Sequence, residues 1–128
     1  MIAAGGGKLE LLDWVNEDPQ PVFYLDGEML EEDIHERIKL LIPSLDLDEE
    51  ELRKNFRFIS RVSQPDEVEE FLSLELEKNQ WELLNWVRDN TEKGSHPIVV
   101  LDNLSNLVEL GDDNSAGQMQ NFNMMVTK

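Results

Sequence analysis

Carboxylates placed directly after short apolar runs are the residues of this sequence with the clearest potential for chemistry. The apolar run 98–101 ends on Asp102, which Asn103 and Ser105 follow. In an open parallel sheet, ligands bind beyond the carboxyl ends of the strands. A carboxylate at such an end can hold Mg²⁺ directly or through water, as in proteins that handle phosphates. Structural strands also end on carboxylates, so this run alone leaves both interpretations open.

Two further apolar runs carry polar residues at their ends. Asp26 and Glu28 follow the run 22–25, and Ser60 and Arg61 lie near the end of the run 56–62. Parallel strands place their carboxyl ends at the same edge of a sheet, where carboxylates can bind a metal ion or orient an attacking water. The sequence therefore predicts a polar edge built from three strand ends.

A glycine-rich turn followed by a lysine lies near the N-terminus, at Gly5, Gly6, Gly7 and Lys8. Backbone N–H groups of such a turn, together with the cation, can cradle the β and γ phosphates of a nucleotide. Compared with the pattern G-x-x-x-x-G-K-[ST], the segment departs twice, because Ile2 stands at the first glycine and Leu9 at the hydroxyl position. A phosphate loop and a flexible glycine linker therefore both remain open.

Helical patterns separate the three apolar runs. Residues 30–41 repeat apolar side chains at helical spacing, and Pro43 is expected to end that helix. Asp48 and Glu51 have the N-cap and N3 spacing of a capping box, which predicts the start of a short helix. A long helix is predicted over residues 65–93, with a glycine cap. Strands separated by such helices favour right-handed crossovers and a parallel sheet.

The predicted fold class is therefore α/β, a small parallel or mostly parallel sheet of at least three strands with flanking helices. The 128 residues suit a single domain over residues 1–128. Trp81 and Trp86 are expected to fill the core or a groove, and His35 and His96 show no ligand pattern. Residues 112–117 are expected to form a polar loop and 119–126 a final short helix.

Composition narrows the classes of function. The net charge of −17 opposes the counterion release that drives proteins onto nucleic acid, so direct nucleic-acid binding is disfavoured. No apolar run approaches the roughly 20 residues of a membrane span, and the N-terminus has no signal-peptide pattern. The chain has no cysteine, which excludes disulfides and thiolate chemistry. A cytoplasmic protein without a membrane anchor is expected.

The order of these segments resembles the RepA-like branch of RecA-fold P-loop ATPases, which is related to DnaB-type replicative helicases. Four segments carry the resemblance over about residues 14–126, namely 22–29, 31–37, 56–61 and 98–105. The resemblance implies a Walker B role for Asp102, on Mg²⁺, and a catalytic-base role for Glu28. It also implies phosphate binding by Lys8 and the amides of Gly6 and Gly7, with ATP and Mg²⁺ as cofactors and an acidic loop at 112–114.

The chain departs from that family around the phosphate loop. Only residues 9–21 lie between Lys8 and Val22, where the family has a full helix and a loop. Leu9, Leu11, Leu12 and Val15 are expected to form at most a two-turn helix. The chain also ends at Lys128, before the family's later strands.

Three hypotheses follow from these matches and departures. The first is a truncated RecA-fold ATPase domain with the Walker B strand and the catalytic-glutamate segment retained, a degenerate Walker A, and weak or no ATP binding and hydrolysis. The second is a non-catalytic acidic interaction module that keeps the fold and recruits a basic protein partner. The third is self-association as a dimer or higher oligomer through open sheet edges.

Overall fold

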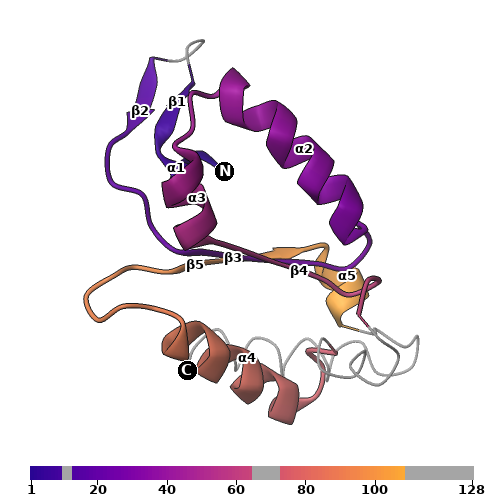
Figure 1. Cartoon of the computed structure of the whole chain (residues 1–128). Coiled ribbons are helices and arrows are strands. Elements are labelled where there is room, and N and C mark those ends of the chain that lie inside the picture. The colour runs from indigo at the N-terminus through magenta and orange to yellow at the C-terminus, as the bar shows by residue number, and fades with distance from the viewer. Residues whose placement is uncertain (10–12, 65–72, 109–128) are drawn as a thin grey trace.

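The computed structural model describes residues 1–9, 13–64 and 73–108. Figure 1 shows the arrangement of its helices and strands. The helices are α1 (Ile2–Gly5), α2 (Glu31–Ser44), α3 (Glu49–Asn55), α4 (Glu77–Asp89) and α5 (Leu104–Leu107). The strands are β1 (Gly7–Leu9), β2 (Trp14–Asn16), β3 (Val22–Asp26), β4 (Phe56–Ser60) and β5 (Ile98–Asp102).

The three apolar runs form one parallel sheet, as predicted. Its strand order is β4-β3-β5, with β3 in the centre and parallel to both neighbours. Asp26 at the end of β3 is in register with Ser60 of β4 and with Asp102 of β5. The α/β fold class is therefore confirmed, and it is consistent with a partial RecA-like core.

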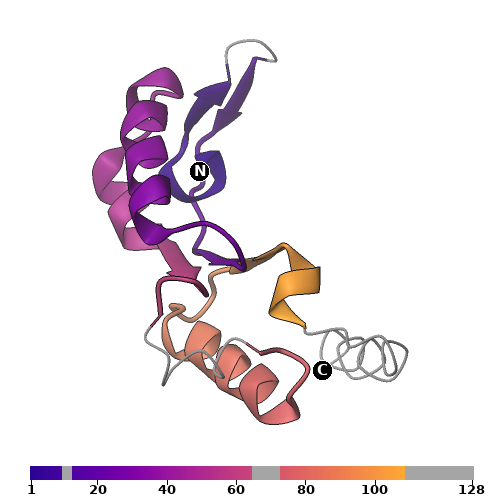
Figure 2. The ribbon, with the colours of Figure 1, turned by 90° about the vertical axis from the view of Figure 1, so that its right-hand side faces the viewer.

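Helices cover both faces of this sheet. In Figures 1 and 2, α1, α2 and α3 lie on one side of the sheet and α4 lies on the other. Successive residues of a strand point to opposite faces, so β3 contributes to two cores. Phe23 and Leu25 pack with Leu83 and Val87 of α4, whereas Val22 packs with Leu52 of α3.

The two tryptophans of α4 differ in burial. Trp86 packs against the core on its face of the sheet and meets Phe23 edge to face, with ring centroids 4.9 Å apart. This confirms the predicted core role of Trp86. Trp81 is 47% exposed and lies at the surface of the same helix.

Two helix boundaries differ from the prediction. Pro43 lies inside α2, which ends one residue later at Ser44. The helix predicted over residues 65–93 is shorter, because within the described residues it begins at Glu77 and ends at Asp89. Gly94, with φ +95°, belongs to the connection that follows rather than to the helix cap. Residues 65–72, and the loop and helix predicted over 112–126, lie outside the described residues.

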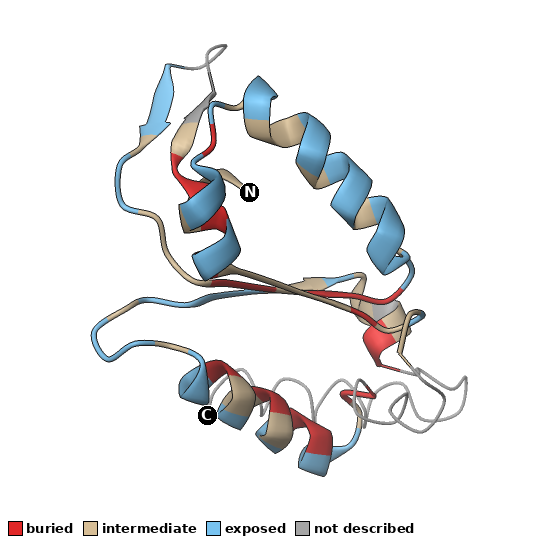
Figure 3. Cartoon of the chain, in the orientation of Figure 1, coloured by how far each residue is buried: buried red, intermediate tan, exposed pale blue. Residues whose placement is uncertain are grey.

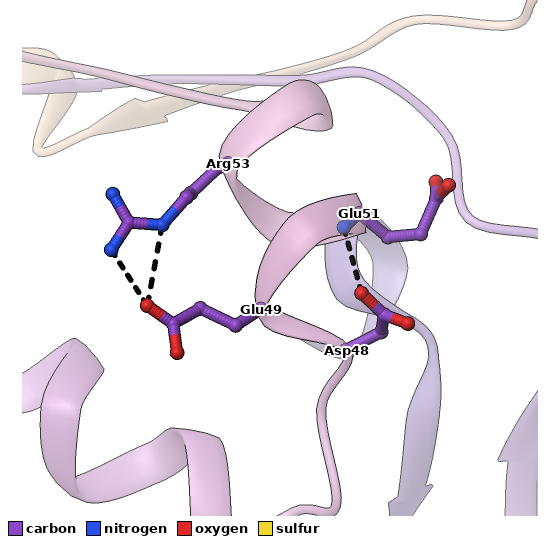
Figure 4. A network of polar contacts seen from close by, with 4 residues as sticks. All are labelled: Asp48, Glu49, Glu51 and Arg53. Atoms are coloured by element: carbon purple, nitrogen blue, oxygen red, sulfur yellow. Dashed lines mark hydrogen bonds and ion pairs between the residues drawn. The ribbon is translucent and has the colours of Figure 1, made fainter.

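The predicted start of α3 is confirmed. Asp48 is the N-cap residue, and its carboxylate accepts a hydrogen bond from the Glu51 backbone N–H at 2.9 Å (Figure 4). The capping box is only half formed, since the Glu51 carboxylate instead accepts from the Asn55 side chain at 3.1 Å. Arg53 also binds Glu49 one turn earlier, at 2.6 Å.

The two-turn helix expected from Leu9, Leu11, Leu12 and Val15 is wrong for the residues that the structure describes. β1 and β2 instead form an antiparallel hairpin in which Leu9 pairs with Trp14 and Lys8 with Val15. Leu11 and Leu12 lie outside the described residues. Valine and tryptophan favour strands, and this local preference agrees with the hairpin.

The helices that the structure describes are too short or too polar to cross a membrane. Within the described residues, none combines the length and the apolar character that a bilayer requires.

Candidate functional site

The carboxyl ends of the three parallel strands form the candidate site. Because Asp26 is in register with both Ser60 and Asp102, the sheet brings three polar strand ends side by side. The Gly27 N–H donates to the Asp102 carbonyl at 2.7 Å, and the Arg61 N–H donates to the Asp26 carbonyl at 2.8 Å. Both neighbouring strands are thus tied to the turn that follows β3.

The buried side chain of Asp26 stabilises the turn that follows β3. Its side chain is only 3% exposed, and Oδ1 accepts from the backbone N–H groups of Glu28 at 2.7 Å and Met29 at 2.6 Å. An aspartate that binds the backbone two and three residues ahead stabilises a turn. The Ser60 hydroxyl donates to the Met29 carbonyl at 2.6 Å and so holds the same turn from β4. These contacts give Asp26 and Ser60 a structural role.

Glu28 is exposed, and the segment after β5 fixes its orientation. Its Oε1 accepts from the side-chain amide of Asn103 at 3.0 Å and from that of Asn106 at 2.5 Å. The two asparagines lie one helical turn apart, so both amides can reach one oxygen. Sequence reasoning named Asn103 but missed Asn106, because an asparagine inside a short helix carries no signal for a contact 78 residues away in the chain.

Asp102 is held by a tyrosine of the central strand. The Tyr24 hydroxyl donates to Asp102 Oδ2 across the two strands. Burial of the phenol, the hydrogen bond to Asp102 and the negative charges of Asp102 and Asp26 together raise the pKa of Tyr24 to about 12, and Arg37 opposes this shift. Tyr24 is therefore a neutral proton donor at physiological pH. Sequence analysis did not single it out.

The predicted carboxylates line a hollow of about 320 Å³ at this edge. Asp26, Glu28, Asp33 and Asp102 contribute acidic side chains to its wall, and Arg37 contributes a cation. Among the described residues, no group of three or more acidic, histidine or cysteine side chains is placed to hold a metal ion.

The glycine turn lies elsewhere in the fold. The Gly5 carbonyl accepts from the Asp48 N–H at 2.9 Å, and the Asn55 side chain donates to the Ala4 carbonyl at 3.0 Å. Asn55 directly precedes the first residue of β4, so this contact lies at the opposite end of the strands from Asp102. Figure 1 shows α1 and the hairpin beside α3 and away from α5.

Close packing explains the glycines of this turn. Gly6 and Gly7 have φ angles of +64° and +89°. A Cβ on Gly7 would lie 2.9 Å from the Asp46 carbonyl oxygen and closer still to that of Leu45. Lys8 is in β1, paired with Val15. The structure thus brings Glu28 and Asp102 together but does not bring Gly5, Gly6, Gly7 and Lys8 to them.

The fold and the site define an α/β protein with a three-stranded parallel sheet, helices on both faces and a carboxylate-rich edge at the carboxyl ends of the strands. No protein-family model, curated protein or solved structure matches the chain. The resemblance to RepA-like ATPases therefore stays a prediction from the sequence.

Proposed function

We propose that the chain is a RepA-like RecA-fold domain that retains the Walker B strand and the catalytic-glutamate segment, with weak or no ATP binding and hydrolysis. One observation carries this proposal. Asp102 and Glu28 share one edge of the sheet, whereas the glycine turn at residues 5–8 packs beside α3 at the other end of the strands.

The residues at the carboxylate edge fit a hydrated cation better than Mg·ATP. Mg²⁺ bound to a nucleotide takes one or two carboxylates and completes its shell with phosphates and water, and Asp102 suits that role. A triphosphate also needs clustered N–H donors and a cation. Among the described residues that line the hollow, Arg37 is the single cation, and four residues carry carboxylates. We therefore derive no hydrolytic step at this site.

A calorimetric titration with Mg·ATP tests the proposal. We expect no saturable heat at micromolar nucleotide for the parent chain, because the glycine turn at residues 5–8 lies at the other end of the strands from the carboxylate edge. Asp102→Asn is the test variant, and Asp89→Asn, an exposed charge change on α4, is its matched control. Micromolar binding, whether or not Asp102→Asn weakens it, would contradict the claim of lost nucleotide binding. ATP hydrolysis at a helicase-like rate would contradict the claim of lost catalysis.

An acidic interaction module is the second candidate. The first turn of α2 carries Glu31, Glu32 and Asp33, and that of α3 carries Glu49, Glu50 and Glu51. Both helices lie on the same side of the sheet, within a chain of net charge −17. Acidic side chains stabilise helix starts, but two such clusters on one side also favour a basic protein partner.

Capture experiments on the immobilised chain separate this candidate from the first. Retention of a basic protein that falls with rising salt, and that ATP leaves unchanged, would support the module. The charge-neutralised variant Glu31→Gln/Glu32→Gln/Asp33→Asn should retain less, and retention that ignores both salt and this variant would contradict the proposal. A cytoplasmic location, as expected from the sequence, is the setting in which such a partner would be sought.

We also propose self-association at the sheet edges. β4 and β5 are the outer strands of the described sheet, and Ile98 and Val99 of β5 are each 41% exposed. Edge strands with exposed apolar residues invite pairing with another chain. Native mass measurement over a wide concentration range tests this proposal, and a monomer throughout would exclude it.

A further inference from the structure

Strand β2 is the outer strand of the N-terminal hairpin, and one of its edges is free. Its other edge pairs with β1, which itself lies against the connection between α2 and α3, close to the carbonyl groups of Leu45 and Asp46. Among the described residues, β2 pairs with no further strand. Figure 3 shows β2 as mostly exposed. A free strand edge presents backbone N–H and C=O groups to which an extended segment of another chain can bind.

Both faces of β2 carry an exposed apolar side chain. Trp14 is 65% exposed and Val15 is 63% exposed. Successive side chains of a strand point to opposite faces, so these two lie on opposite sides of the hairpin. A helix placed on one face would cover only one of them. A strand added along the edge of β2 can contact both, because its own side chains also alternate. The two faces together therefore favour an extended occupant.

Contacts with the N-terminal segment hold β2 in place. Asn16 Nδ2 donates to the Ile2 carbonyl at 2.8 Å, and Asn16 Oδ1 accepts from the Asp18 backbone N–H at 3.2 Å. Shortly after the strand, the Gln20 N–H donates to the Ala3 carbonyl at 2.7 Å. The strand is thus fixed in its extended form before a partner arrives, which lowers the entropy cost of binding.

The charges around β2 favour a basic segment. Asp13 precedes the strand and Glu17 follows it, and both are exposed. Among the described residues, neither carboxylate takes part in an ion pair. Asp46, on the connection beside β1, is also exposed and adds a third negative charge. Lys8 of β1 is the single lysine or arginine of residues 1–18. Lysine and arginine side chains of a partner would therefore meet mainly carboxylates here.

The same charges disfavour a second copy of the chain at this edge. Two copies of β2, paired antiparallel over their full length, would place Asp13 of one copy opposite Glu17 of the other. Like charges directly opposite each other destabilise a strand pair, and an acidic peptide would meet the same carboxylates. Asp18 does not enter this comparison, because it lines a separate hollow together with Lys54 and Arg57. A basic extended segment meets neither penalty.

We propose that the free edge of β2 binds an extended basic segment of a partner protein. The backbone of that segment pairs with β2, its apolar side chains contact Trp14 and Val15, and its lysine or arginine side chains lie at Asp13 and Glu17. An arginine can also stack on the Trp14 ring. This proposal gives the acidic interaction module a contact surface and rests on that proposed function for the class of partner. It does not depend on the carboxylate edge.

A short synthetic peptide of alternating arginine and valine is the probe, and one of alternating glutamate and valine is its control. We expect the indole N–H resonance of Trp14 to shift with the arginine peptide alone, and the binding to weaken as the salt concentration rises. The resonance of Trp86, which packs edge to face on Phe23, should stay in place. Equal shifts with both peptides, or no shift at Trp14, would overturn the proposal.

Substitution of the exposed tryptophan tests the apolar contact. Trp14→Ala should weaken binding of the arginine peptide about tenfold, because an aromatic ring is lost from the centre of the interface. Trp81→Ala, at an exposed position of α4, should leave it unchanged. Equal binding by the two variants would overturn the role of the hairpin.

A pair of charge variants tests the choice of a basic partner. Asp13→Asn/Glu17→Gln should weaken peptide binding about 3- to 10-fold. Asp89→Asn/Glu92→Gln removes the same charge at exposed positions outside the hairpin and should leave binding unchanged. Equal weakening by both variants would show that net charge alone attracts the peptide, and would overturn the proposed surface.

Two outcomes separate this surface from the acidic interaction module itself. Salt-dependent retention of a basic protein by the immobilised chain, without any binding of the peptide at Trp14, would overturn the hairpin surface alone. The absence of both retention and peptide binding would overturn the module as well.

Discussion

Gly7 and Gly27 both stand where another segment comes too close for a side chain, but they serve different parts of the molecule. A Cβ on Gly7 would collide with the carbonyl oxygens of Leu45 and Asp46, within the packing of the hairpin against the α2–α3 connection. A Cβ on Gly27 would lie 2.7 Å from Asn106 Cβ, in the segment that positions Glu28. Gly7, in the segment that resembles a phosphate loop, permits close packing. Gly27 permits the close approach of the residues that position Glu28 in the candidate site.

This difference shows that the role of a glycine-rich segment depends on the residues that surround it in the fold, and not on its sequence alone. A phosphate loop requires free N–H groups that face a ligand. Gly7 lies against backbone carbonyls instead, with no space for a side chain. Gly27, in contrast, lets the segment after β5 approach the turn after β3, so that Asn103 and Asn106 reach one carboxylate oxygen.

Gly7→Ala should have the largest effect on stability. The substitution places a Cβ against two backbone carbonyls at a φ of +89°, and neither carbonyl can rotate away as a side chain could. We expect a loss of about 3 kcal/mol or more in the free energy of unfolding, measured by denaturant titration.

Gly94→Ala is the matched control for that experiment. Gly94 has a similar φ of +95°, but a Cβ added there would meet nothing within 4 Å. Only the backbone strain remains, so we expect a loss of about 1 kcal/mol. Equal losses at Gly7 and Gly94 would mean that the turn at Gly7 is open, as a phosphate loop would be.

Gly27→Ala should have the next largest effect, because the added Cβ would lie 2.7 Å from Asn106 Cβ, an atom that moves only with the backbone of Asn106, while no left-handed φ adds strain at Gly27. A loss of about 1–3 kcal/mol is expected from overpacking. The substitution should also move the side-chain amide resonances of Asn103 and Asn106, which depend on the approach of the two segments. Unchanged amide resonances would show that Gly27 does not position Glu28.

The sequence was sufficient to predict the parallel sheet and the position of its polar strand ends at one edge. Apolar runs bounded by turn residues predicted β3, β4 and β5, and the helices between them required parallel pairing. Asp102 and Glu28 then meet at one edge because carboxyl ends of parallel strands always do. The cap of α3 was also predictable, since the contact between Asp48 and Glu51 is local.

The remaining features depend on contacts between residues distant in sequence. The hairpin of β1 and β2 was missed because apolar residues spaced over residues 9–15 also suit a helical turn. In the fold, Gly7 of β1 instead lies against the carbonyl groups of Leu45 and Asp46, which are distant in the chain. Asn106 and Tyr24 were missed because their partners are 78 residues away in the chain in each case. The position of the glycine turn was equally hidden, because it depends on contacts with residues 45–48.

The titration of Tyr24 tests the carboxylate edge without any ligand. This is the single tyrosine of the chain, so its phenolate absorbance can be followed directly. We expect a midpoint of about 12 in the folded chain, above the ordinary pKa of 10.0. A raised pKa stabilises the fold in full below the unfolded pKa, so this contribution should be lost as the pH rises from about 10 through about 12.

Asp102→Asn separates the causes of that shift. The variant removes a negative charge but keeps an oxygen that can accept from Tyr24, so the midpoint should fall yet stay above 10.0, because burial is the largest cause. The control Asp89→Asn should leave the midpoint in place. A midpoint that is the same in the parent chain and in Asp102→Asn would show that Tyr24 and Asp102 do not meet.

Glu28→Ala should have the smallest effect on stability. Its carboxylate is exposed, so losing two hydrogen bonds from asparagine amides should lower the free energy of unfolding by about 1 kcal/mol or less. The clearer readout is local, because the amide resonances of Asn103 and Asn106 should move together while that of Asn90, bound to the Trp86 carbonyl at 2.8 Å, stays in place. Glu28→Gln keeps the accepting oxygen and should restore most of the parent spectrum. Separate responses of Asn103 and Asn106, or a spectrum of Glu28→Gln that resembles that of Glu28→Ala, would show that the two amides do not bind the same Glu28 oxygen. The carboxylate edge would then lack the ordered contacts that distinguish it from the glycine turn.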